Sequence, residues 1–91
     1  MTEKEIRFSQ HALTKFEILA AHGFDLEREL IVNTIRNATA VFEGYRGRKI
    51  AQGPLDARRV LRVVYEEGDD DILVITFYPG RRERYEQDQV Q

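Results

Sequence analysis

The hydrophobic pattern changes its period near residue 39, and this change constrains the fold more than any other feature of the sequence. Over residues 10–22 and 26–37, apolar side chains recur every three or four positions, which is the spacing of amphipathic helices. From Thr39 onward the period is two, as in β-strands. The stretches with this period are residues 39–43, 48–52, 59–67 and 71–78. The sequence therefore predicts two N-terminal helices followed by a sheet.

Residues at the boundaries support these limits. A short first strand is expected at residues 6–8, and Ser9 is then an N-cap candidate, because its hydroxyl can accept from a free amide of the first helical turn. Gly23 stands where a helix-terminating glycine is common, Asp25 is the N-cap candidate of the second helix, and Asn37 is its terminator. The remaining turns are expected at residues 44–47, 53–54, 68–70 and 79–80.

The last two predicted strands form a hairpin whose register follows from its apolar faces. If both apolar faces lie against the helices, odd positions oppose odd positions, so Val63 pairs with Ile75 and Leu61 with Phe77. The inward faces are then Leu61, Val63 and Tyr65 with Leu73, Ile75 and Phe77. The second face carries Val60, Arg62, Val64, Ile72, Val74, Thr76 and Tyr78, with Arg62 across from Thr76.

The pattern as a whole predicts an α+β fold in which two N-terminal helices pack on one face of a small antiparallel sheet. The length of 91 residues fits a single domain, residues 1–91, with residues 86–91 expected to fray. Hydrophobic residues make up 42% of the chain and charged residues 33%, which is the balance of a globular protein and not of a disordered one. The polar start, Met1 to Glu5, does not resemble a signal peptide, so a cytoplasmic protein is expected.

The chain contains no cysteine, which excludes disulfides, thiolate zinc sites and cysteine nucleophiles. No spacing of histidines and acids suggests a metal site, and no glycine-rich phosphate loop is present, so neither metal nor cofactor is expected.

Charge is strongly segregated along the chain although the formal net charge is only −2. Residues 44–65 hold six basic residues against one acid, a local charge of +5, whereas residues 66–71 hold five acids and no base. Three arginines, Arg81, Arg82 and Arg84, then surround Glu83. The basic stretches keep nucleic-acid binding open, because binding follows local patches. Pairing of these arginines with acids on a solvated sheet is the alternative.

Two groups of side chains are candidates for chemistry. His11 and Lys15 are one helical turn apart and could transfer protons or contact phosphate, or His11 could be a helix-start residue bonded to nearby backbone. Arg62 lies in the middle of a strongly apolar strand, near Tyr78. Its guanidinium could hold a phosphate in two hydrogen bonds, or its stem could cover apolar surface while its head reaches a carboxylate.

Aromatic and basic residues are adjacent at two further places, Tyr45 with Arg46 and Tyr85 with Arg84. Such pairs can stack on bases and neutralise phosphates. The full set expected to contact nucleic acid is Lys15, Tyr45, Arg46, Arg48, Thr76, Arg81, Arg84 and Tyr85.

Two stretches resemble a known family. "FSQHALTKFEILAAHGF" resembles the "FS-x-HA…RG-I" opening of a family of small bacterial and phage domains, although His22 stands where that family has arginine. "LRVVYEEGDDDILVITFYPGRRERY" resembles the same family's "LRVVY…VIT-x-Y" hairpin. The family looks like a branch of the RelE/ParE toxin superfamily, near the BrnT-like toxins. The resemblance covers most of the chain and is weakest over residues 38–58.

The resemblance implies the β-α-α-β-β-β order of that superfamily and the toxin component of a type II toxin–antitoxin pair, acting as a metal-independent mRNA endonuclease. It assigns family positions to His11, Arg62, Thr76 and Tyr78, and it places Arg82 and Tyr85 near the active site. Arg62 and Arg82 would stabilise the charge on the phosphate, while His11 or Tyr78 would carry protons. The implied partners are RNA and a cognate antitoxin protein.

A different class of function is also compatible with the sequence. The acidic balance and the apolar residues of the second sheet face favour a non-catalytic module that binds protein or nucleic acid. Under either hypothesis, those apolar residues predict a homodimer or a complex with an antitoxin. No membrane association is expected, because the chain has no long apolar run.

Overall fold

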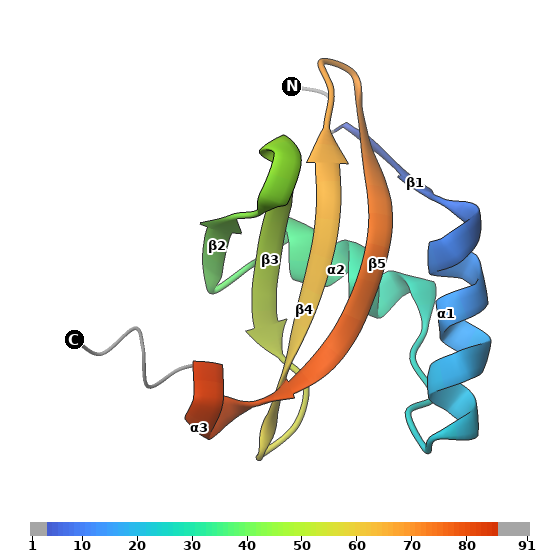
Figure 1. Cartoon of the computed structure of the whole chain (residues 1–91), viewed down its shortest axis with the longest axis vertical. Coiled ribbons are helices and arrows are strands. Elements are labelled where there is room, and N and C mark those ends of the chain that lie inside the picture. The colour runs from blue at the N-terminus through green and yellow to red at the C-terminus, as the bar shows by residue number, and fades with distance from the viewer. Residues whose placement is uncertain (1–3, 86–91) are drawn as a thin grey trace.

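The computed structural model describes residues 4–85 and shows a sheet with two helices on one face (Figure 1). Five strands form this sheet, in the order β1-β5-β4-β3-β2. The elements in chain order are β1 (Glu5–Phe8), α1 (Gln10–Ala21), α2 (Arg28–Arg36), β2 (Ala40–Glu43), the 3-10 turn η1 (Tyr45–Gly47), β3 (Lys49–Pro54), β4 (Arg59–Glu67), β5 (Asp71–Arg81) and α3 (Arg82–Tyr85). The predicted α+β class is confirmed.

The sheet is mixed, and the prediction of a purely antiparallel sheet is wrong. β1 pairs in parallel with β5, from Glu5 opposite Asp71 to Phe8 opposite Val74, while the other three pairs of strands are antiparallel. A parallel pair needs a long connection, which the two helices and three strands between β1 and β5 supply. The four strands after the helices match the four predicted from the periodicity, and they are one more than the β-α-α-β-β-β order that the resemblance implies.

Ser9 joins β1, α1 and β5 through three hydrogen bonds. Its side chain accepts from the Ala12 amide at 3.1 Å, which confirms the predicted N-cap of α1. The same hydroxyl donates to the Ile75 carbonyl at 3.0 Å, and the Ser9 amide donates to the Val74 carbonyl at 3.0 Å. The start of α1 is therefore tied to the middle of β5.

Ile75 is the extra residue of a β-bulge, and the predicted hairpin register is wrong because of it. Val64 pairs with Thr76 but Tyr65 pairs with Val74, so Ile75 has no partner on β4. On the C-terminal side of the bulge the register is two residues from the predicted one, with Val63 opposite Phe77. An extra residue reverses the faces of a strand beyond it. Ile72 and Val74 therefore face the helices, and Leu73 and Ile75 do not share the face of Phe77.

Three predicted boundaries also differ. α2 begins at Arg28 with Glu27 as its N-cap, two residues after the expected Asp25–Leu26 start, because Leu26 packs against the core in the connecting segment. β3 extends through Pro54, and β5 extends through Pro79 to Arg81. Past Val74, β5 has no strand on the side of β1, so the missing amide of Pro79 costs no ladder hydrogen bond there.

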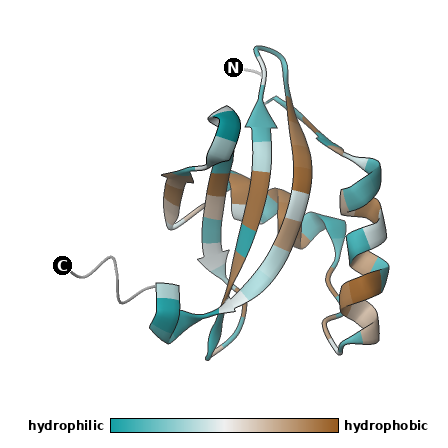
Figure 2. Cartoon of the chain, viewed as in Figure 1, coloured by the Kyte–Doolittle hydropathy of each residue, from teal (hydrophilic) through white to brown (hydrophobic). Residues whose placement is uncertain are grey.

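The main core lies between the helices and the central strands. Buried side chains from α1, α2, β4 and β5 form it: Ala12, Leu19, Ile31, Leu61, Val63, Val74 and Phe77. Figure 2 shows the hydrophobic residues in the middle of the strands and hydrophilic residues at the β4–β5 tip and on α3. Because strand residues alternate, the even positions of β4 lie on the opposite face, which we call the open face.

We expect Leu61→Ala to lower the free energy of unfolding by about 2–5 kcal/mol, because a fully buried side chain is lost and a cavity remains. Urea unfolding followed by circular dichroism measures the change. Ile18→Ala on α1 is the matched control, since Ile18 is 44% exposed and its truncation should cost less than about 1 kcal/mol. Equal losses in the two variants would contradict the assigned core.

Candidate anion-binding site

Arg62 lies at the centre of the open face, surrounded by side chains from four elements. Its Nη1 donates to Oε1 of Gln52 on β3 at 2.6 Å, and its Nε donates to the hydroxyl of Tyr78 on β5 at 3.2 Å. Its guanidinium carbon lies 5.2 Å from the ring centre of Phe42 on β2 and 4.2 Å from that of Tyr85 on α3. We call these five residues the Arg62 cluster.

The strand register produces this arrangement. Arg62 pairs directly with Tyr78 on one side and with Gln52 on the other, so three polar side chains form a row across β3, β4 and β5. The sequence placed Thr76 opposite Arg62, and this is wrong, because Thr76 pairs with Val64. The shift of two residues brings the Tyr78 hydroxyl within hydrogen-bonding distance of the guanidinium.

Arg62 is largely buried and has no acidic partner among the described residues. It is only 9% exposed, and none of the carboxylates in residues 4–85 forms an ion pair with it. Its Nη2 makes no hydrogen bond, yet the described residues contain no buried side-chain nitrogen without a partner. Nη2 therefore reaches solvent. A buried guanidinium that is held by neutral groups and open at one nitrogen can accept an anion.

The ring of Tyr85, which follows β5 in the chain, covers the guanidinium of Arg62. After β5 the chain turns into the four-residue helix α3, and the Tyr85 ring returns over the open face at Gly80. A Cβ at Gly80 would overlap the ring, so only glycine allows it to lie there. Val60, the ladder partner of Gly80, is 1% exposed although it belongs to the open face.

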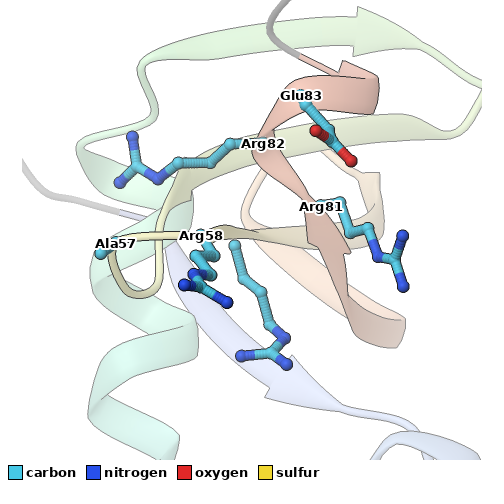
Figure 3. Close-up of a pocket in the computed structure, with 6 residues that line it drawn as sticks. Ala57, Arg58, Arg81, Arg82 and Glu83 are labelled. Atoms are coloured by element: carbon cyan, nitrogen blue, oxygen red, sulfur yellow. The ribbon is translucent and has the colours of Figure 1, made fainter.

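A second basic feature lies at the end of the sheet where β4 begins and β5 ends. A cavity of about 600 Å³ is lined there by Ala57, Arg58, Arg59, Arg81, Arg82 and Glu83, which we call the arginine pocket (Figure 3). In Figure 3, Arg58 extends downward from the loop, Arg81 extends to the right and Arg82 extends to the left, where its Nε donates to the Asp56 carbonyl at 2.8 Å.

Asp56 organises the loop that presents the pocket. Its carboxylate accepts from the Arg58 amide at 2.8 Å and from the Arg59 guanidinium at 3.2 Å, and these contacts hold the pKa of Asp56 below its ordinary value. The Asp56 carboxylate therefore stays ionised and neutralises Arg59. The exposed guanidiniums of Arg58 and Arg81 have no carboxylate partner in residues 4–85.

The opposite end of the sheet is acidic, and its charges are largely paired. Glu67 accepts from Lys4 at 2.9 Å and from Lys49 at 2.8 Å, which together lower the pKa of Glu67 to about 2. Arg48 pairs with Glu66 at 3.1 Å, and Arg7 pairs with Asp71 at 3.3 Å. The alternative that the arginines pair with acids thus holds for Arg7 and Arg48 at this end, whereas Arg58 and Arg81 at the other end have no carboxylate partner in residues 4–85.

The structure brings together only part of the set expected from the sequence. Arg62, Tyr78 and Tyr85 meet in the Arg62 cluster, and Arg81 and Arg82 line the arginine pocket. Arg84 lies beside Tyr85, with its guanidinium carbon 5.9 Å from the ring centre.

The remaining expected residues lie elsewhere. His11 and Lys15 are on α1, in the helix layer, which the sheet separates from Arg62. Tyr45 and Arg46 form the exposed η1 turn at the acidic end of the sheet, where Arg48 is already paired. The structure therefore does not bring His11 to the Arg62 cluster.

Several residues of the two features were missed by the sequence reasoning. Phe42 and Gln52 reach Arg62 only through the register of β2 and β3, and Arg59 pairs with Arg81 only in the observed register of β4 and β5. Gln52 is the one residue of this group that the sequence could have indicated. A glutamine that is buried in a strand needs a hydrogen-bond partner, and its presence there predicts a polar neighbour. From the sequence, Glu83 was expected only to offset the charge of the neighbouring arginines, and no place in a pocket was predicted for it.

Among residues 4–85, no helix is long and apolar enough to cross a membrane, and no three histidine or acidic side chains converge as metal ligands. Comparisons with protein-family models, with curated proteins and with solved structures found no match to this chain.

We expect Glu67→Gln to destabilise the protein at pH 7 by about 1 kcal/mol, because two ion pairs are lost at a partly exposed site. The pKa of Glu67 is lowered from 4.5 to about 2, so its contribution is present above pH 4.5 and disappears as the pH falls toward 2. Urea unfolding at several pH values measures the difference between the two proteins.

Asp69→Asn is the matched control for this prediction, since it removes the same charge from the same tip at an exposed residue. A Glu67→Gln penalty that stayed constant down to pH 2 would contradict the ion-pair assignment.

Proposed function

We propose that this protein binds single-stranded RNA, with the arginine pocket holding backbone phosphates. The observation that carries the proposal is the pair of exposed guanidiniums, Arg58 and Arg81, which line one cavity of about 600 Å³ and have no carboxylate partners in the described residues. Guanidinium groups bind phosphate oxygens in pairs of parallel hydrogen bonds.

The strand pairing strengthens this argument. Arg59 and Arg81 are direct partners across β4 and β5, and the Arg82 amide donates to the Arg58 carbonyl, so four arginines are fixed near one another. Like charges opposite each other destabilise a sheet. An external polyanion would relieve this repulsion, and Asp56 and Glu83 are the acids that the structure places beside the four cations.

Single-stranded RNA fits better than a duplex. The basic residues surround a pocket and lie close to an aromatic ring on α3, and they come from a loop, from strand ends and from the four-residue α3, which is too short to enter a groove. Pockets that combine cations with exposed aromatic rings bind flexible strands whose bases are unstacked.

We expect the double variant Arg58→Ala/Arg81→Ala to bind a labelled single-stranded RNA more weakly at every salt concentration. Loss of two phosphate contacts should also reduce the slope of log affinity against log salt by about 1.4, at about 0.7 per contact. Fluorescence anisotropy over a salt series measures both quantities.

Arg7→Ala/Arg28→Ala is the control, because it removes the same charge from β1 and α2, away from the pocket. Equal weakening by the two double variants would mean that net charge alone drives binding. Salt-independent binding by the wild type would contradict the proposal outright.

A second candidate function, an RNA-cleaving toxin, is favoured by the contact between Arg62 and Tyr78. The Arg62 Nε–H donates to the Tyr78 oxygen, which leaves the tyrosine proton free to be donated elsewhere, and the free Nη2 of Arg62 reaches solvent beside it. In such a reaction the 2′-hydroxyl attacks the adjacent phosphorus and loses its proton to water. Arg62 stabilises the charge on the phosphoryl oxygens, and Tyr78 donates its proton to the departing 5′-oxygen.

Cleavage would yield a 2′,3′-cyclic phosphate and a free 5′-hydroxyl, and would fail on a substrate with 2′-deoxyribose at the scissile position. We expect Tyr78→Phe to lower the rate by about 100-fold or more, because the proton donor is lost. Glu17→Gln, an exposed change on α1, is the control. Unchanged cleavage by Tyr78→Phe, or no cleavage by the wild type together with normal growth of cells expressing it, would reject this second function.

A toxin of this kind would be held inactive by an antitoxin, and the open face is the surface we propose for it. The sequence predicted a partner because it placed Ile72 and Val74 on the exposed second face. Both residues belong to the core, so the open face has less apolar surface to cover than expected. The open face retains Phe42, Ile50 and Val64, which are half-buried.

A further inference from the structure

The Tyr85 ring fills a flat space on the open face that the strands themselves leave empty. Gly80 is the floor of this space, because any Cβ there would overlap the ring. The Arg62 guanidinium lies against the same ring, 4.2 Å from its centre. We call the space between Gly80 and Arg62 the Gly80 slot.

The slot adjoins a second cavity that lies beside the arginine pocket. This second cavity, of about 390 Å³, is lined by Pro79, Gly80, Arg81, Glu83, Arg84 and Tyr85. It shares Arg81 and Glu83 with the arginine pocket. A planar group in the slot would therefore lie next to the cations that bind phosphate.

We propose that the Gly80 slot is a binding site for a nucleobase, and that Tyr85 occupies it in the free protein. The proposal rests on the proposed RNA-binding function, which would supply the base, and it adds a recognition site to the phosphate contacts. A base matches the space because it is flat and aromatic, as the tyrosine ring is, and because guanidinium planes stack on such rings.

Polar groups are present where the edge of a base would lie. The Tyr78 hydroxyl accepts one hydrogen bond from Arg62 and has its own proton to donate. Arg62 itself reaches solvent through Nη2. A base stacked on the Arg62 guanidinium could accept from the Tyr78 hydroxyl at its edge, a hydrogen bond that the Tyr85 ring does not make, while Nη2 points along the guanidinium plane toward solvent.

Tyr85 can be displaced at small cost because α3 is short. The helix has only four residues, Arg82–Tyr85, none of them fully buried. Occupation of the slot by Tyr85 makes the open state a minor one, which lowers the apparent affinity for a base by the open fraction. Removing the ring should remove this penalty.

The test uses adenosine, which carries a base and no phosphate, so that the slot is probed separately from the arginine pocket. Titration into ¹⁵N-labelled wild type and Tyr85→Ala, followed through the Gly80 amide resonance, reports binding at the slot. We expect saturable shifts in both proteins at millimolar adenosine, with about two- to fivefold tighter binding to Tyr85→Ala, the factor that one cation–π contact represents.

Three further variants make the result specific. Tyr85→Phe keeps the ring and must not show the gain. The double variant Tyr85→Ala/Gly80→Ala must lose it, because the added methyl group fills the floor of the slot. Ile18→Ala, an exposed truncation on the helix layer, should bind as the wild type. A well-dispersed spectrum verifies that each variant is folded.

Equal or weaker adenosine binding by Tyr85→Ala overturns the proposal, as does a gain that survives Gly80→Ala or the absence of any saturable shift. RNA binding by the wild type is measured separately. If RNA binding by the wild type does not depend on salt, the proposal that the arginine pocket binds phosphates is rejected. If adenosine binds as expected in the same protein, the proposal that the Gly80 slot binds a base still stands.

Discussion

The bulge at Ile75, held by Ser9, is the constraint on which the rest of the structure depends. Without it, β5 would present Leu73, Ile75 and Phe77 to one face, and Val74 would leave the core. With the extra residue, Val74 and Phe77 both pack inward, although they are three positions apart. The Ser9 hydroxyl binds the Ile75 carbonyl and caps α1 at the same time, so one side chain sets both the phase of β5 and the start of the helix.

The same register creates the polar row on the open face. Gln52, Arg62 and Tyr78 are neighbours only because β4 aligns with β3 and β5 as it does. Burial of a guanidinium is costly unless its hydrogen bonds are satisfied, and here neutral partners satisfy two of them while two aromatic rings cover the group. The charge is thereby kept without being neutralised, which is the property an anion site requires.

The two ends of the sheet carry opposite charge, with acids at the β4–β5 hairpin tip and arginines at the other end. Ion pairs of Lys4, Arg7, Arg48 and Lys49 neutralise acids at the hairpin tip, which leaves the arginines at the other end of β4 and β5 as the separate basic region. Because β4 and β5 are antiparallel, the arginines before the tip and those after it return to the same end. The net charge of −2 conceals this arrangement.

The sequence by itself determined the α+β class, the order of helices and strands, the Ser9 cap and the segregation of charge, because local periodicity and composition carry this information. It did not determine the bulge or the site built on it. Residues 72–75 are all apolar, so alternation could not assign their faces, and the shift by two residues decided whether Thr76 or Tyr78 met Arg62. The return of Tyr85 over Gly80 was also a tertiary outcome, since it depends on where β5 ends relative to Arg62 and on the space that one missing Cβ leaves.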